Sequence, residues 1–219
     1  MKKKENDHAE IFTINCEKCT RLSKNLKKIK VQFPHYYCKP VPSFGSKRVK
    51  LLIVGLAPGL NGANQTGRPF TGDYAGIILY KTLYRFGYAN QPISVHAKDG
   101  LRLSDCKITN AVKCFPPDNK PILDEVKQCN HYLRSEIDQY QPPAILALGR
   151  IAHQAVLRSM NLVPKNFIFS HAAQHQISER TRLFNSYHCS RYNTQTRRLS
   201  SEMFDGVFND IHVYLGLAS

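Results

Sequence analysis

A glycine-rich segment in the first half of the chain has the composition of a close-fitting ligand site. Six glycines lie within residues 55–76, and Arg68, Pro69 and Phe70 stand among them. Glycine lets the backbone approach a ligand closely and adopt positive φ angles. The segment lacks the Gly-Lys-Ser/Thr ending of a mononucleotide-binding loop, and no G-x-G-x-x-G sequence opens a helix in it. Flexibility alone would not require Arg68 and Phe70 here, so we interpret the segment as a binding loop.

Two later segments begin with side chains that could read or activate a ligand. Asn110 follows an apolar run and precedes Ala-Val-Lys-Cys-Phe-Pro-Pro. Its amide could form a turn, or it could donate to one atom of a base edge and accept from another. His188 also follows an apolar run, and the polar, basic stretch behind it could bind phosphates. The hydrogen-bonding and charged residues of that stretch are Ser190, Asn193, Thr196, Arg197 and Arg198.

Four of the seven cysteines have a spacing that is compatible with a metal site. Cys16 and Cys19 form a C-x-x-C pair, and Cys114 and Cys129 lie 15 positions apart further along the chain. Four thiolates suit either zinc or an iron–sulfur cluster, and the residue types do not separate the two. The alternative is a set of unrelated thiols, with Cys129 on the buried face of a helix. In a reducing cytosol none of the seven is expected to form a disulfide.

These loops need regular elements to bring them together, and the hydrophobic pattern predicts such elements. Short apolar runs predict buried strands at residues 49–55, 107–112, 144–149 and 183–188, with a weaker candidate at 167–169. Helical patterns lie at residues 20–30, 74–86, 121–139, 150–160 and 198–215. The alternation predicts an α/β fold, in which three α/β/α layers surround a central, mostly parallel four-stranded sheet. Ligands of such sheets bind beyond the carboxyl ends of the strands, where these loops begin.

The composition favours one domain that binds a polyanion. The length of 219 residues fits a single domain, and 42% hydrophobic residues are enough for a core. Lys and Arg number 31 against 16 Asp and Glu, a net charge of +15, which indicates nucleic acid unless the charge serves only solubility. No apolar run approaches the roughly 18 residues of a membrane span, and the charged N-terminus is unlike a secretory signal. We therefore expect a cytoplasmic protein whose polar residues 1–9 are frayed.

Four stretches of the chain are weak signals individually, but together they are specific for one protein family. They are Gly55-Leu-Ala-Pro-Gly59, Gly67-Arg-Pro-Phe-Thr-Gly-Asp-Tyr-Ala-Gly76, Asn110-Ala-Val-Lys-Cys-Phe-Pro-Pro, and His188-Cys-Ser-Arg-Tyr-Asn193 with Thr196 and Arg198. They resemble the motifs of the iron–sulfur uracil-DNA glycosylases, and within them the branch called UDGb, or family five. The resemblance extends from about Cys16 to about Asp210. In the last motif the family usually has Pro where this chain has Cys189, and Gly where it has Arg197, so we expect the loop that would clamp DNA to differ in shape.

The resemblance implies an enzyme that acts on damaged DNA. A single domain over residues 1–219 would flip a uracil base out of the DNA and hydrolyse its N-glycosidic bond, leaving an abasic site. The partners implied are single- and double-stranded DNA that contains uracil, with no membrane, and we expect a monomer. The resemblance also implies a structural [4Fe–4S] cluster held by Cys16, Cys19, Cys114 and Cys129. The alternative from another class is a non-catalytic, metal-stapled nucleic-acid-binding module.

The resemblance further implies roles for the motif residues. Phe70 would stack on the flipped base, Asn110 would read the uracil edge, and His188 would donate a hydrogen bond to O2 as the bond breaks. Asp73, the nearest motif carboxylate, could activate water or could only cap a helix. The substrate would also contact Gly55, Gly59, Ser190, Asn193 and Arg198. Stringent relatives carry a bulky aromatic residue at the position of Gly59, so we expect a pocket that accepts bases beyond uracil.

Overall fold

Four parallel strands form the centre of the sheet. In the computed structural model, which describes residues 12–217, they are β2 (Leu51–Gly55), β3 (Cys106–Asn110), β4 (Ala144–Leu148) and β6 (Arg182–Ser186). Their order is β3-β2-β4-β6, and each neighbouring pair is parallel. The strands predicted from the four apolar runs are therefore confirmed. The expected fraying of residues 1–9 lies outside the described residues.

Two short strands at the edges make the sheet six-stranded, so the predicted number of four is wrong. β1 (Phe44–Gly45) pairs antiparallel with β3, and β5 (Gln174–Gln176) pairs antiparallel with β6. Neither edge strand contains an apolar run, because each is only partly covered by protein. The weaker strand candidate at 167–169 is also wrong, since these residues lie in the loop between the 3₁₀ helix η2 (Pro164–Asn166) and β5.

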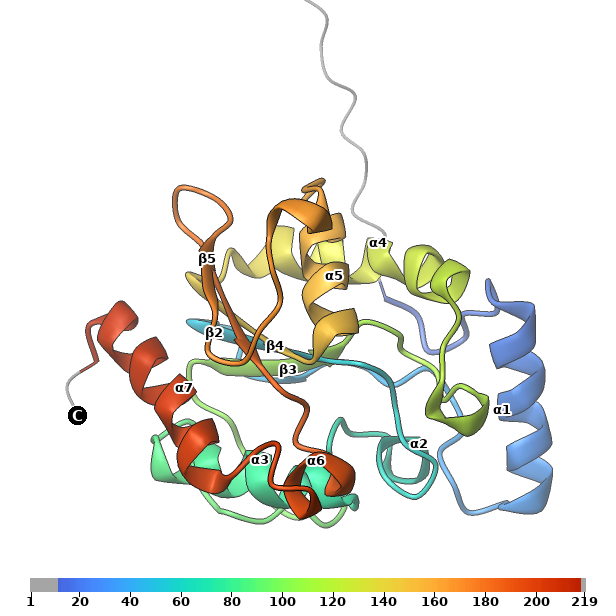
Figure 1. The fold of residues 1–219 in the computed structure, drawn as a ribbon. Coiled ribbons are helices and arrows are strands. Elements are labelled where there is room, and N and C mark those ends of the chain that lie inside the picture. Colours follow the sequence, from blue (N-terminus) through green and yellow to red (C-terminus); the bar gives the residue numbers. More distant parts are fainter. Residues whose placement is uncertain (1–11, 218–219) are drawn as a thin grey trace, which may run out of the picture.

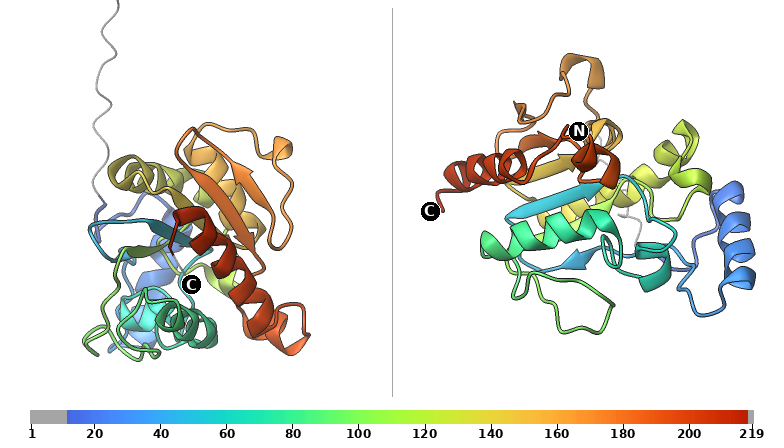
Figure 2. Two further views of the ribbon diagram at one scale, coloured as in Figure 1. Left: turned by 90° about the vertical axis from the view of Figure 1, so that its left-hand side faces the viewer. Right: turned by 60° about the horizontal axis from the view of Figure 1, so that its bottom comes forward.

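Helices cover both faces of the sheet, which confirms the predicted three-layer α/β/α fold. On one face lie α3 (Tyr74–Arg85) and α7 (Ser201–Leu215). On the other lie α4 (Leu123–Tyr140) and α5 (Arg150–Ser159), with α1 (Thr20–Gln32) beside them (Figure 1 and Figure 2). Successive side chains of a strand point to opposite faces. Leu51 and Ile53 of β2 thus pack in the core with α3 and α7, whereas Leu52 and Val54 pack in the core with α1, α4 and α5.

The loops that follow β2, β3 and β6 meet at the carboxyl edge of the sheet. Gly55 and Asn110, the last residues of β2 and β3, are register partners there. The loops contain short helices, which are α2 (Ala63–Thr66), the 3₁₀ helix η1 (Pro117–Asn119) and α6 (Arg191–Gln195). The motif residues are therefore held beside one another by a buried parallel sheet. None of the helices within residues 12–217 is both long and apolar enough to span a bilayer.

Candidate active site

A cavity of about 490 Å³ opens at the carboxyl edge of the sheet, between the loops that follow β2, β3 and β6. Among its lining residues are six of those that the motifs predicted: Gly59, Phe70, Asp73, Asn110, His188 and Ser190. These residues come from three segments that are far apart in the sequence. The fold thus produces one chemically varied pocket with aromatic, amide, imidazole, hydroxyl and carboxylate groups.

Phe70 lies in the cavity wall in a conformation that few side chains adopt. Its φ angle is +53°, in the left-handed region that is costly for residues other than glycine. The backbone is held there because the buried Tyr80 hydroxyl donates to the carbonyl of Pro69 at 2.7 Å. The Phe70 ring stacks near the His188 ring, with 5.9 Å between the ring centroids. An aromatic surface is therefore fixed beside the imidazole.

Gly55 does not line the cavity, but it allows two lining residues to approach each other. A Cβ atom at this position would lie 2.3 Å from Asn110 Oδ1 and 2.6 Å from Phe70 Cζ. These distances are well inside van der Waals contact. Glycine is therefore needed at the end of β2 so that the amide and the aromatic ring can come together.

Asn110 has a buried oxygen without a protein partner. Its side chain is only 4% exposed, and no group within residues 12–217 hydrogen-bonds to its Oδ1 atom. Leaving a buried acceptor unsatisfied costs about 1–3 kcal/mol. A turn-forming asparagine would have used this oxygen locally. Asn110 also lines the cavity, so its amide is a candidate to hydrogen-bond a ligand there.

His188 is electrically neutral in its surroundings. It lies two residues beyond β6, and burial lowers the pKa of its imidazole to about 4. The Asn193 side chain donates to the His188 carbonyl oxygen at 2.8 Å, which fixes the backbone. A neutral imidazole keeps one N–H group, so it can donate one hydrogen bond to a ligand.

Asp73 both caps a helix and faces the cavity. Its Oδ1 atom accepts from the Gly76 N–H at 2.9 Å, at the start of α3. Burial raises the pKa of the carboxyl, although the backbone N–H groups of Gly76 and Ala75 act in the opposite direction. The capping interpretation is confirmed. It does not exclude the water-activating one, because the residue also lines the cavity.

The loop after His188 uses its predicted residues in three different ways. Ser190 lines the cavity and caps α6, where its hydroxyl accepts from the Asn193 N–H at 3.4 Å. Asn193 supports the His188 backbone, as described above, and is not among the cavity-lining residues. Arg198 is exposed and lies over the Tyr187 ring, 4.5 Å from its centroid. It does not line the cavity.

This loop departs from the family motif at Cys189 and Arg197, and the structure shows the surroundings of both residues. Cys189 is fully buried, and burial raises the pKa of its thiol. It fills an apolar site as an inert side chain. Arg197 has a φ angle of +56°, the conformation that glycine would adopt most easily. Arg197 thus adopts a backbone conformation that glycine would reach at lower cost.

Three further lining residues with polar side chains were not predicted from the sequence, namely Tyr74, Asn119 and Arg191. The Arg191 guanidinium lies over the Tyr74 ring, 5.2 Å from its centroid. The Thr194 hydroxyl donates to the Tyr74 hydroxyl at 3.2 Å. Tyr74 and Arg191 fall inside the recognised motifs, but spacing alone does not tell which motif side chains point into a cavity.

The four candidate cysteines line a separate small cavity between α1 and α4. Burial raises the pKa of the Cys129 thiol to about 11, while the Lys113 N–H donates to its sulfur at 3.3 Å. Burial and then the neighbouring thiols raise the pKa of Cys114. All seven cysteines are free thiols. Within residues 12–217, no group of three or more His, Cys, Asp or Glu side chains is arranged to hold a metal ion.

Comparison with known proteins decides the family. Residues 42–212 match the model of the uracil DNA glycosylase superfamily. The chain belongs to this superfamily. The family resemblance that the motifs predicted is confirmed, and the α/β fold agrees with it.

Several members of the superfamily are similar over most of the chain. A type-5 uracil-DNA glycosylase of Thermus thermophilus is 41% identical over 183 residues, which is 83% of each chain. A type-5 uracil-DNA glycosylase of Mycobacterium leprae is 42% identical over 186 residues, covering 83% of this chain and 81% of the relative. A type-4 uracil-DNA glycosylase of Pyrobaculum aerophilum is 36% identical over 148 residues, or 67% of this chain and 61% of the relative.

Proposed function

We propose that this member of the superfamily removes uracil from DNA by hydrolysing the N-glycosidic bond, leaving an abasic site for repair. The observation that carries the proposal is the cavity in which Phe70, Asn110 and His188 come together. The names of its type-5 relatives agree with it. A base inside a duplex cannot reach such a cavity, so the nucleotide must be flipped out, at a cost of a few kcal/mol.

Each of the three residues has a task that suits its surroundings. Phe70 offers an aromatic face, and base–aromatic stacking contributes about 1–3 kcal/mol. The Asn110 Oδ1 atom, which has no hydrogen-bond partner within residues 12–217, accepts a hydrogen bond from the N–H on the base edge. The neutral His188 donates to the O2 atom of uracil, where negative charge accumulates as the bond breaks. Asp73 then orients or activates the water that attacks C1′.

Release of free uracil from a synthetic duplex tests this proposal. The protein should convert uracil-containing strands to alkali-labile abasic strands in the presence of a chelator. The rival, a module that binds DNA without catalysis, would shift the same duplex in a gel without releasing a base. That result would overturn the proposal.

The proposed partner is DNA, single- or double-stranded, bound by a monomer in the cytoplasm. With a net charge of +15, DNA affinity should fall steeply with salt, by a slope of about −0.9 in log K against log salt for each duplex phosphate contacted. Changing both Arg197 and Arg198 to alanine should make the slope shallower by the contribution of about two phosphate contacts. Arg180→Ala is the matched control, because Arg180 lies at the amino end of β6, away from the cavity. Equal slopes in the parent and the double variant would contradict the assignment of these arginines.

We also propose that Cys16, Cys19, Cys114 and Cys129 hold a [4Fe–4S] cluster. Their shared cavity has walls from α1, α4 and the loop after β3, and four cysteines are the usual ligand set of such a cluster. Four thiolates can also hold zinc, and it is the resemblance to the iron–sulfur branch that favours the cluster. The cluster would cross-link α1 to α4, and hydrolysis needs no redox step.

Protein prepared without oxygen should therefore be brown and contain iron. Cys16→Ala should reduce the iron content and lower the melting temperature, because the link between α1 and α4 is lost. Cys106→Ala is the control, since Cys106 is buried against the other face of the sheet. Elemental analysis that finds zinc and no iron in the parent protein would contradict the cluster.

The cavity is proposed to accept bases beyond uracil, because Gly59 leaves space in its wall. A Cβ atom at this position would lie 3.8 Å from Asp73 Oδ2 and 3.9 Å from Asn119 Oδ1, so a side chain can be added. Gly59→Tyr should narrow the cavity and disfavour hypoxanthine, xanthine or thymine against uracil by roughly 10–200-fold. Gly59→Ala, which adds one methyl group, is the control and should keep the broad range. Duplexes with each base opposite guanine provide the assay, and a parent active on uracil alone would contradict the prediction.

A further inference from the structure

A second hollow of about 490 Å³ lies directly beside the active-site cavity. Its walls include Ile77 of α3 and the segment from Pro92 to Val95, which belongs to the long loop between α3 and β3. It shares Asp73, Tyr74 and Arg191 with the active-site cavity. The two hollows are therefore neighbours on one surface, with these three residues as the partition.

The wall of the second hollow presents apolar side chains to solvent. Ile77, Ile93 and Val95 are 62%, 61% and 60% exposed. A group of large exposed apolar side chains around a hollow is a common mark of a binding surface. None of these three side chains has a role in the proposed reaction.

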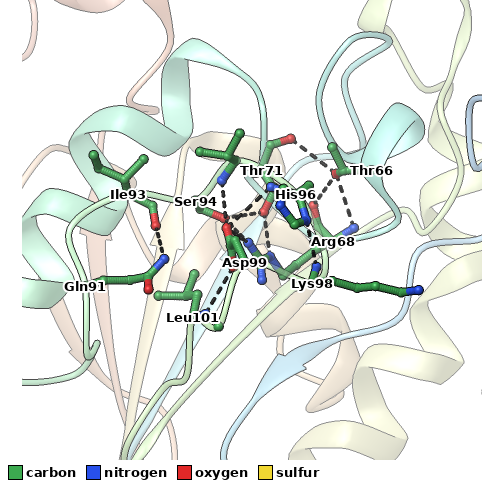
Figure 3. Close-up of polar contacts among 12 residues, drawn as sticks. Thr66, Arg68, Thr71, Gln91, Ile93, Ser94, His96, Lys98, Asp99 and Leu101 are labelled. Carbon is green, nitrogen blue, oxygen red and sulfur yellow. Dashed lines mark hydrogen bonds and ion pairs between the residues drawn. The ribbon is translucent and has the colours of Figure 1, made fainter.

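The loop that carries Ile93 and Val95 is held rigidly against the Phe70 segment (Figure 3). Asp99 Oδ2 accepts from Arg68 Nη2 at 2.6 Å and from the Val95 N–H at 2.8 Å. Arg68 also donates to Ser94 Oγ at 2.7 Å. The Arg68 side chain is only 4% exposed, so water screens this ion pair little. The hollow is thus preformed, and a ligand need not spend binding energy on ordering the loop.

We infer that this hollow holds the base of the nucleotide next to the flipped one in the same DNA strand. The inference rests on the proposed function of the neighbouring cavity. The partition between the hollows includes the Tyr74 ring, with the Arg191 guanidinium 5.2 Å from its centroid. Two base sites that share so few wall residues match consecutive nucleotides of one strand, whose bases normally stack directly on each other.

Charge and polarity agree with this occupant. The exposed Arg191 stands on the ridge between the two hollows, where the phosphate that links the two nucleotides must pass. Guanidinium groups bind phosphates well. Aliphatic side chains such as Ile93 and Val95 can pack against the flat face of any base, so binding here would be independent of sequence. The hollow would keep the strand unstacked while the target base is in the active-site cavity.

Fluorescence of 2-aminopurine tests the inference, because this base brightens when it leaves a stack. The probe is a single-stranded oligonucleotide with 2-aminopurine beside a stable abasic analogue, placed on the 5′ side in one version and on the 3′ side in the other. Binding of the parent protein should alter the fluorescence for one side only. The double variant I93S/V95S should abolish that change and weaken binding of the oligonucleotide roughly 10-fold, because apolar contact area with the base is lost.

Two controls keep the outcome interpretable. Ile168→Ser removes an apolar side chain that is 78% exposed in a loop outside both hollows, and it should bind like the parent. Ile93→Leu retains the apolar surface and should preserve the fluorescence change. If I93S/V95S binds the oligonucleotide like the parent, with the same fluorescence, the hollow serves something other than DNA and the inference is overturned. Failure of the parent to release uracil would instead overturn the proposed function, since the binding experiment requires no catalysis.

Discussion

Replacement of His188 by alanine is expected to slow uracil release by roughly 10²–10³-fold, the usual effect of removing one donor aimed at developing charge. The imidazole lines the cavity, and Asn193 fixes its backbone through a hydrogen bond of 2.8 Å to the carbonyl oxygen. Single-turnover rates measured with excess enzyme separate this effect from DNA binding. His175→Ala is the matched control, because His175 lies on the edge strand β5 and does not line the cavity.

The pH dependence of the same reaction tests how His188 acts. Burial disfavours the charged imidazolium and lowers the pKa to about 4, whereas a free histidine has a pKa of about 6.5. Above about pH 5 the group is therefore already neutral, and the single-turnover rate should be flat from about pH 6 to 8. A mechanism that needs imidazolium would lose rate as the pH rises through this range. A His188→Ala variant that works at the parent's rate would show that another group stabilises the leaving base.

Asn110→Ala is expected to lower kcat/KM for uracil release by about 100-fold. Two hydrogen bonds to the base edge would be lost, each worth about 1–1.5 kcal/mol. The free energy of unfolding should change much less than the activity, because the buried Oδ1 atom has no partner within residues 12–217. Removing an unsatisfied buried oxygen relieves a cost that the folded protein otherwise bears.

Asn185→Ala provides the contrasting control. Asn185 is also fully buried, but its oxygen lies 2.9 Å from His153 Nδ1 and its nitrogen donates to the Ala173 carbonyl at 3.2 Å. This change should reduce stability measured by urea denaturation while leaving the chemical step intact. If Asn110→Ala instead loses stability and keeps its activity, Asn110 is a structural residue and not a reader of the base.

The hydrophobic pattern predicted the centre of the fold well, for a physical reason. Ala144–Leu148 is buried along its whole length, and its uninterrupted apolar run is the pattern that marks such a strand. The edge strand Gln174–Gln176 is mostly exposed, and nothing in its residues distinguishes it from a loop. The apolar residues at 167–169 led to the opposite error, because they predicted a strand where the structure has a loop. Phe167 packs on the core from a loop, while Ile168 is 78% exposed.

The residues of the site could be predicted more easily than their roles. Motif spacing located Asn110 and His188, because both must follow strands that end at the same edge of the sheet. Spacing could not tell that Asn193 supports the backbone or that Arg198 lies over Tyr187, since each role depends on a short local hydrogen bond or ring contact. Nor could it reveal the Tyr74 and Arg191 pair, which joins two segments far apart in the sequence.

The contrast between Gly55 and Gly59 bears on how such enzymes can diverge. At position 55 any Cβ atom would collide with Asn110 and Phe70, so no mutation can explore new chemistry there without disrupting both. At position 59 a side chain has space and faces the cavity. With the proposed function, a lineage could therefore change its range of lesions through one codon while Phe70 and Asn110 stay in place. Selection for broader or narrower repair would then leave its trace at residue 59, four positions from a glycine that has no space for a side chain.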